Sequence, residues 1–132
     1  MKTPAELAKG WFLKADSDLN TARTVLATAG PYDTACFHAQ QAVERYMKGF
    51  LDYHDRPYPL IHDLGKLALL CEGVDPSMGL STPEVASLTD YAVLLRYDSE
   101  FWPERNVAED AVRVADHVRA TILATLPAEA RP

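Results

Sequence analysis

The stretch from residue 35 to 51 carries apolar side chains at the spacing of an α-helix, and this spacing restricts the fold more than any other feature of the chain. Side chains that recur every three or four residues lie on one face of a helix and form the stripe that packs against other helices. We expect Asp33 to cap this helix, which runs to about Tyr53. The stripe consists of Ala35, Ala39, Ala42, Val43, Tyr46, Met47 and Phe50.

A second face of the same segment carries polar residues with the same period, namely His38, Gln41, Arg45 and Lys48. A helix that only has to remain in solution does not need this combination, because Lys, Glu and Asp would serve. One interpretation is a polar groove that holds a ligand. The alternative is that His38 is a half-buried hydrogen-bonding group, while Arg45 and Lys48 are solvated and Lys48 forms an ordinary helix pair with Glu44.

The first helix is predicted to begin with a capping box from Thr3 to Glu6, with Pro4 at its first position, and to end at Gly30. A third helix begins at His62 or Asp63. The predicted apolar stripe of the first helix is Leu7, Trp11, Ala15, Leu19, Ala22 and Leu26, and that of the third is Leu64, Leu67, Ala68 and Cys71.

Glycine and proline place the remaining boundaries. Gly73 is expected to end the third helix, and residues 81–84 start a fourth helix that stops before Pro103. Asn106 and Glu109 are expected to form the capping box of the last helix. The predicted stripes are Val85, Leu88, Ala92 and Leu95 in the fourth helix and Val107, Ala111, Val114, Val118 and Ile122 in the last.

These patterns predict an all-α fold, an up-and-down antiparallel bundle of about five helices. Residues 1–132 are expected to form a single helical domain, with a core at about 5–126 and a frayed tail at 127–132. No internal repeat or linker divides the chain. Connections of roughly 5 to 10 residues between long helices suit such a bundle.

Composition excludes several classes of protein. Hydrophobic residues make up 48% of the 132 residues, which is typical of a globular chain rather than a disordered one. No run of eighteen apolar residues and no apolar leader is present, so we expect a cytoplasmic protein without a membrane segment. The formal net charge of −6 disfavours broad binding to nucleic acid, although it leaves room for a local basic cleft.

Neither the cysteines nor the histidines form a motif for metal or thiol chemistry. Cys36 and Cys71 lie in apolar-periodic segments and are expected to be buried thiols. His62 and Asp63 lack the two-ligand helical spacing of a zinc site and fit the start of a helix instead. We therefore expect no metal and no cofactor.

Four motifs occur together in a recognisable order, and through them the chain resembles the HEPN family (higher eukaryotes and prokaryotes nucleotide-binding domain). The resemblance extends over roughly residues 5–125. The motifs are Trp11-Phe12-Leu13-Lys14-Ala15 with Asp18-Leu19, the segment 37–48, His62-Asp63-Leu64 and the segment 91–98.

The resemblance implies a helical bundle that is often paired as a homodimer, and an association with nucleotide or RNA chemistry. It also implies a partner, because bacterial and archaeal relatives often accompany a minimal nucleotidyltransferase, in some cases as toxin and antitoxin.

Family members that cut RNA carry an arginine, four to six residues, and then a histidine. The arginine stabilises charge on the phosphate, and the histidine handles the proton of the 2′-hydroxyl group. No histidine follows Arg96 before His117, and Asp98 and Glu100 place negative charge beside it. The five-residue spacing from Arg56 to His62 falls in a proline-broken loop, so we do not transfer ribonuclease activity.

Arg96 and His38 are the first candidates for catalysis. One interpretation of Arg96 is a phosphate ligand. The alternative is that it contacts the terminal carbonyl groups of its own helix, or pairs with Asp98 or a carboxylate of the second helix. Tyr97 and the following Phe101 and Trp102 suit base stacking, core sealing or a dimer contact. The candidate ligand-binding residues are His38, Gln41, Arg45, Lys48, Arg96, Tyr97 and Asp98.

The sequence favours a non-catalytic or degenerate HEPN-like module that is associated with nucleotides or RNA. It would act as a homodimer with a minimal nucleotidyltransferase or under its regulation. Two alternatives stay open. One is a metal-independent ribonuclease that uses Arg96 with a histidine from elsewhere, His38 or His62, as the toxin of a toxin–antitoxin pair. The other is a sensor that binds a nucleotide without hydrolysing it.

Overall fold

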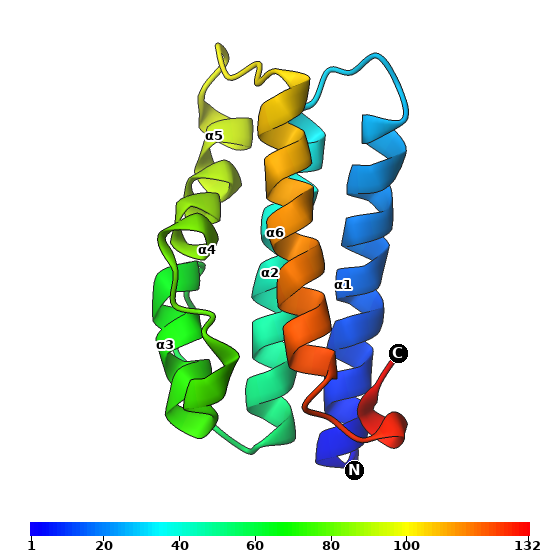
Figure 1. Cartoon of the computed structure of the whole chain (residues 1–132), viewed down its shortest axis with the longest axis vertical. Helices are drawn as coiled ribbons and strands as arrows, with labels where there is room; N and C mark the ends of the chain where they lie inside the picture. The colour runs from blue at the N-terminus through cyan, green and yellow to red at the C-terminus, as the bar shows by residue number, and fades with distance from the viewer.

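The computed structural model describes residues 1–132 and contains helices but no strand, which confirms the predicted all-α bundle (Figure 1). Three long helices pack side by side, and a column of shorter helices lies beside α2. None of the helices combines the length and the apolar composition that crossing a bilayer requires. The helices are α1 (Pro4–Leu26), α2 (Asp33–Tyr53), α3 (Leu64–Val74), α4 (Pro83–Ser87), α5 (Tyr91–Tyr97) and α6 (Arg105–Leu123).

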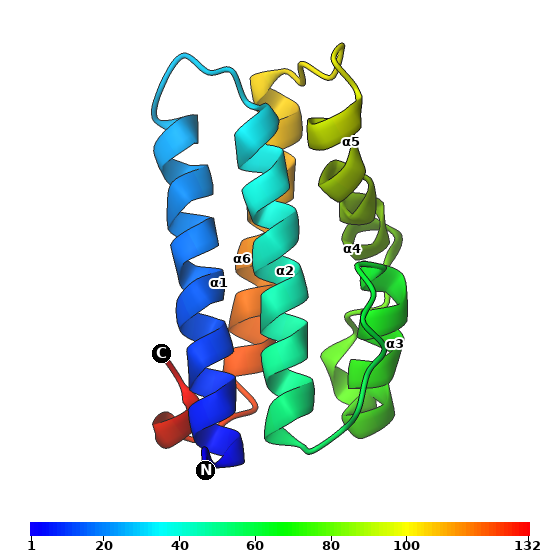
Figure 2. The same ribbon diagram turned by 180° about the vertical axis from the view of Figure 1, so that it is seen from behind.

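Helix α2 is the centre of the bundle, because it packs against α1, α3, α5 and α6. In Figures 1 and 2, α6 lies on one side of α2. Helix α1 and the α3–α5 column flank α2. All seven residues of its predicted apolar stripe are fully buried, which confirms that prediction. The helical period of the sequence therefore determined which face of α2 enters the core.

The predicted stripe of α1 is partly wrong. Leu7 is exposed and Trp11 is half-buried, while Ala8 and Phe12 are fully buried in their place. Both sets of residues share the helical period and differ by a rotation of one residue, so period alone cannot choose between them. Trp11 stays near the surface because its indole N–H donates to Asp52 at 2.7 Å.

Three of the predicted helix starts are confirmed by their caps. The side chains of Thr3, Asp63 and Thr82 accept hydrogen bonds from the backbone N–H of the third residue after each. The other two caps were predicted wrongly. Tyr32, not Asp33, occupies the cap of α2, and no side chain caps α6, which begins at Arg105.

The predicted box of Asn106 and Glu109 is therefore absent. Asn106 already lies inside α6, and Glu109 pairs with Arg105 at 3.3 Å. Glu109 lies one turn after Arg105 and forms an ordinary helix pair with it. The same residue also has the spacing of a capping box with Asn106, which explains the wrong prediction.

The predicted fourth helix is broken into α4 and α5 by a 3₁₀ turn at Leu88–Asp90. In this turn the Thr89 hydroxyl accepts the backbone N–H of Leu64, which is the first residue of α3. Val85 and Leu88 are buried as predicted, but no residue of α5 is buried. The turn thus gives the first backbone N–H of α3 a hydrogen-bond acceptor that it would otherwise lack.

The end of α3 and the segment after α6 also differ from expectation. Helix α3 continues through Gly73 to Val74, and Asp75 forms its cap. The expected frayed tail contains a 3₁₀ turn at Ala128–Ala130, with Ala130 fully buried against the core. Burial of this small side chain anchors the segment that follows α6.

Gly49 allows α1 and α2 to approach closely. A Cβ atom at this position would lie 2.6 Å from Cε1 of Phe12. We predict that Gly49→Ala lowers the free energy of unfolding by about 1–3 kcal/mol, because the buried ring has to shift. Gly10→Ala is the matched control, since its Cβ meets no atom within 4 Å, and it should raise stability by about 0.5–1 kcal/mol. Urea denaturation measures both, and equal effects would contradict the close packing.

Cys36 and Cys71 are buried, as predicted. Burial raises the pKa of Cys36 to about 11 and that of Cys71 to about 12, so neither thiol forms a reactive thiolate near neutral pH. We predict that Ellman's reagent at neutral to mildly alkaline pH modifies neither cysteine in the native protein and both in urea. Rapid modification of one cysteine in the native state would show that its thiol is accessible.

Candidate functional site

The side of α2 opposite its buried stripe carries the predicted polar row. We call His38, Gln41, Arg45 and the neighbouring Phe37 the polar face of α2. These residues are half-buried and contact Asp18 of α1 and Arg96 of α5. Helix α1 and the α3–α5 column flank α2 in Figure 2. Three residues of the predicted polar row thus reach the surface in part, whereas the fourth, Lys48, is buried.

Asp18 of α1 holds two residues of the polar face in place. Its carboxylate accepts from Nδ1 of His38 at 2.9 Å and from Nη1 of Arg45 at 2.5 Å. The Asp18 side chain is only 8% exposed, whereas those of His38 and Arg45 are 31% and 32% exposed. The carboxylate is thus buried beneath two basic groups, and Nε2 of His38 and the remaining N–H groups of Arg45 are left for a ligand.

Glu44 forms a second buried centre further along α2. It accepts from Nζ of Lys48 at 3.0 Å and from Nδ1 of His62 at 2.8 Å. The Lys48 ammonium lies 5.9 Å from the centroid of the Tyr58 ring, which comes from the loop after α2. Lys48 is therefore buried within an ion pair and is not solvated, while its expected pairing with Glu44 is present.

Gln40 and Gln41 connect the two centres along the helix. Gln41 donates from Nε2 to Oε1 of Gln40 at 2.7 Å, and Gln40 donates from Nε2 to Oε1 of Glu44 at 3.3 Å. Gln40 is fully buried and Gln41 is half-buried. No buried polar side-chain atom lacks a hydrogen-bond partner, so this network is complete.

Both catalytic candidates lie near the ring of Phe37. The Arg96 guanidinium lies 5.7 Å from the centroid of the Phe37 ring, and the His38 ring lies 5.4 Å from the same centroid. Arg96 does not form the considered pair with Asp98, whose Oδ1 accepts the backbone N–H of Glu100 at 2.9 Å. The fold therefore places Arg96 of α5 beside the polar face of α2.

The other candidates at the end of α5 are less closely connected to this face. Tyr97 is 80% exposed, and Asp98 is an exposed residue that ends α5. Trp102 is exposed, while Phe101 stacks on Tyr91 with ring centroids 5.7 Å apart. Of the aromatic residues after α5, Phe101 thus seals the core, and Tyr97 and Trp102 remain on the surface.

Sequence reasoning did not single out Asp18, Phe37 or Gln40 as site residues. Asp18 had a detectable signal, because it is an acidic residue within the buried stripe of α1, where a charge requires a partner. Gln40 lies four residues before Glu44 on a buried face, which is a similar but weaker signal. Phe37 looked like an ordinary apolar residue, and its role depends on α5.

A third polar cluster joins the three long helices on another side of α2. The Tyr46 hydroxyl donates to Asp16, which also accepts from Nε of Arg119 at 2.8 Å. Burial and the Asp16 carboxylate raise the pKa of Tyr46. These residues link α1, α2 and α6 and have a structural role.

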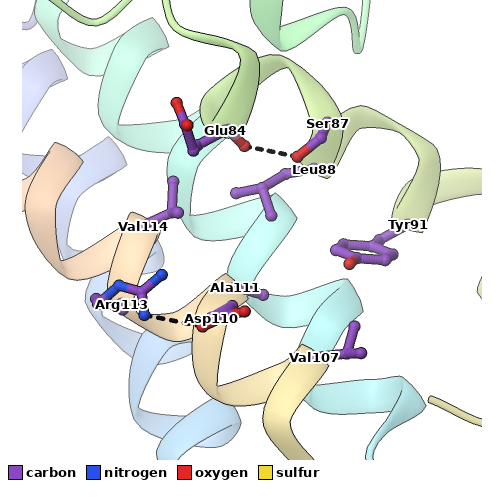
Figure 3. A pocket seen from close by; sticks show the side chains of 9 residues that line it. All are labelled: Glu84, Ser87, Leu88, Tyr91, Val107, Asp110, Ala111, Arg113 and Val114. Atoms are coloured by element: carbon purple, nitrogen blue, oxygen red, sulfur yellow. Dashed lines mark hydrogen bonds and ion pairs between the residues drawn. The ribbon is translucent and has the colours of Figure 1, made fainter. Parts of the chain in front are cut away.

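A cavity of the molecule lies elsewhere, between the α4–α5 column and α6 (Figure 3). Its volume is about 240 Å³, and much of its wall is apolar, with Leu88 and Tyr91 on one side. Arg113 at the rim is neutralised by Asp110 at 2.8 Å. The cavity contains no residue of the polar face.

No group of three or more His, Cys, Asp or Glu side chains is arranged to hold a metal ion. The polar face instead combines hydrogen-bonding and cationic groups with an aromatic ring. Such a combination can contact a phosphate, a ribose or a base.

The pairing around Asp18 leads to a stability prediction. Asp18→Asn removes the buried charge that both His38 and Arg45 contact, and should lower the free energy of unfolding by about 1–3 kcal/mol. Asp116→Asn is the matched control, because Asp116 pairs with Arg23 on the exposed surface and should change stability by less than about 0.5–1 kcal/mol. Equal losses in urea denaturation would show that Asp18 is no more than a surface partner.

Comparison with known proteins identifies a family. A family model described as HEPN domain matches residues 8–125, which include both centres of the polar network and Arg96. Neither curated proteins nor solved structures gave a match. The family match supports a module associated with nucleotides or RNA. Because the match extends over most of its length, the chain belongs to the HEPN family.

Proposed function

We propose that the polar face of α2, together with Arg96, is the ligand-contacting surface of a non-catalytic, nucleotide- or RNA-associated module. The observation that carries this proposal is the pairing of His38 and Arg45 with one buried carboxylate, Asp18. The pairing fixes both side chains and leaves hydrogen-bonding groups of each exposed. A surface that is organised before binding loses less entropy when the ligand arrives.

The local charge differs from that of the whole chain. Asp18 is offset by Arg45, and Glu44 by Lys48, so these pairs carry no net charge when the histidines are neutral. Arg96 adds a positive charge beside Phe37, while Asp98 and Glu100 are exposed just after α5. The overall charge of −6 works against general attraction to RNA. Binding would therefore depend on this one surface and weaken with added salt.

A homodimer would complete the site. No residue of the polar face lines a cavity, so one protomer offers an open surface and not an enclosed pocket. Small ligands usually bind in concave sites, which a second copy would create. A minimal nucleotidyltransferase is the proposed protein partner, in a toxin–antitoxin or related pair in the cytoplasm, and it rests on the family resemblance alone.

The proposal predicts a dimeric mass in light scattering and salt-sensitive binding of single-stranded RNA or nucleotide. Arg45→Ala and Arg96→Ala should each weaken binding about fivefold or more, because each removes a cationic contact. Arg113→Ala is the control, since Arg113 is an exposed arginine on α6. A strictly monomeric mass together with no binding would overturn the proposal. Affinity capture from the native host tests the nucleotidyltransferase separately.

One observation favours a second candidate function, that of a metal-independent ribonuclease. The Asp18 carboxylate accepts from Nδ1 of His38 at 2.9 Å, which leaves Nε2 free to take the proton of a ribose 2′-hydroxyl group. Arg96, beside the same Phe37 ring, would then stabilise charge on the phosphate.

Incubation of RNA with the purified protein and a chelator tests this candidate. Cleavage should then persist in the wild type and disappear in both His38→Ala and Arg96→Ala. Intact RNA after prolonged incubation with wild-type protein would eliminate the ribonuclease candidate and leave the non-catalytic proposal in place.

A further inference from the structure

The orientation of the Gln41 amide is determined by the buried ion pair of Glu44 and Lys48. An ionised carboxylate only accepts hydrogen bonds, so Gln40 must turn its Nε2 toward Glu44. Oε1 of Gln40 then points toward Gln41, which must donate from its own Nε2. The amide oxygen of Gln41 is consequently left without a partner in the protein.

Reversal of the Gln41 amide is unfavourable. It would place its oxygen against Oε1 of Gln40, which is fully buried and has no other donor nearby. Two opposed carbonyl oxygens would repel each other and leave a buried acceptor unsatisfied. The charge of Glu44 thus fixes the orientation of the Gln40 amide, which in turn fixes that of the Gln41 amide. The Gln41 oxygen is left as an acceptor at the protein surface.

Gln41 is well placed to contact a ligand. It lies one helical turn from both His38 and Arg45 and is half-buried. Arg96 and Phe37 present a stacked cation and ring beside this face. A flat base that stacks there would turn its edge toward the groups on α2.

We infer that Gln41 determines base specificity, and that it selects nucleobases with an exocyclic amino group. Its free oxygen accepts from the N4 amino group of cytosine, the N6 amino group of adenine or the N2 amino group of guanine. Uracil and hypoxanthine present no amino group. Their remaining edge donor is a ring N–H beside a carbonyl oxygen, which would be brought against the Gln41 oxygen and weaken the contact. The inference rests on the proposed function, because it names the ligand class of the same surface.

Matched ligand pairs test the inference. Fluorescence anisotropy compares oligocytidine with oligouridine, and one mixed RNA with and without inosine in place of guanosine. Calorimetry with CTP and UTP shows whether free nucleotides carry the same preference as RNA. We expect the amino-bearing member of each pair to bind about fivefold or more tightly, as one specific base contact allows.

Two variants separate specificity from folding. Gln41→Ala should abolish the preference while thermal melting stays close to that of the wild type. Glu44→Gln should reverse the preference. Lys48 holds the oxygen of the new amide in the place of Oε2, so its nitrogen takes the place of Oε1 and donates to Gln40, while the exposed His62 ring presents Nδ1 as an acceptor or turns away. The Gln40 and Gln41 amides then both flip. Asn106→Ala, an exposed amide on α6, is the control and should leave the preference unchanged.

The outcomes distinguish a failure of the role of Gln41 from a failure of the proposed function. Equal binding of cytosine and uracil ligands by the wild type, or tighter binding of uracil, overturns the role of Gln41 and leaves the proposed function standing. Absence of binding to every oligonucleotide and nucleotide refutes both. If Glu44→Gln does not fold, the ratio measured for Gln41→Ala decides, and an unchanged ratio overturns the inference.

Discussion

A carboxylate buried between helices has to be paired. Two such carboxylates, one on α1 and one on α2, organise the surface of this protein. Asp18 and Glu44 are almost removed from water, and each is surrounded by basic or amide groups. The cost of burying such a charge is offset only when its partners hold a defined geometry. His38, Arg45, Lys48 and the glutamines are consequently ordered by requirements of the core, although several of them reach the surface.

This arrangement gives α2 two roles at once. Its apolar stripe is fully buried among the other helices, and Gly49 lets α1 approach closely enough for Asp18 to reach His38 and Arg45. Close helix packing and the polar face therefore depend on each other. A loss of packing between α1 and α2 would also disorder the groups that we assign to ligand contact.

The interrupted fourth helix contributes differently. The 3₁₀ turn at Leu88–Asp90 satisfies the start of α3 through Thr89, and α5 then carries Arg96 to the Phe37 ring. The same column stands apart from α6 and leaves the apolar cavity of Figure 3. That cavity shares no residue with the polar face, so the cavity and the organised polar surface are different places.

The sequence by itself determined the helical class, the buried face of α2, the buried cysteines and the caps at Thr3, Asp63 and Thr82, because these depend on period and on contacts within one turn. It left the rotation of α1 undecided by one residue. Only the tertiary structure decided that Asp18 meets His38 and Arg45, that His62 covers Glu44 and that Arg96 lies over Phe37. These contacts join residues on different elements, and they depend on how whole helices rotate and pack, which no local pattern specifies.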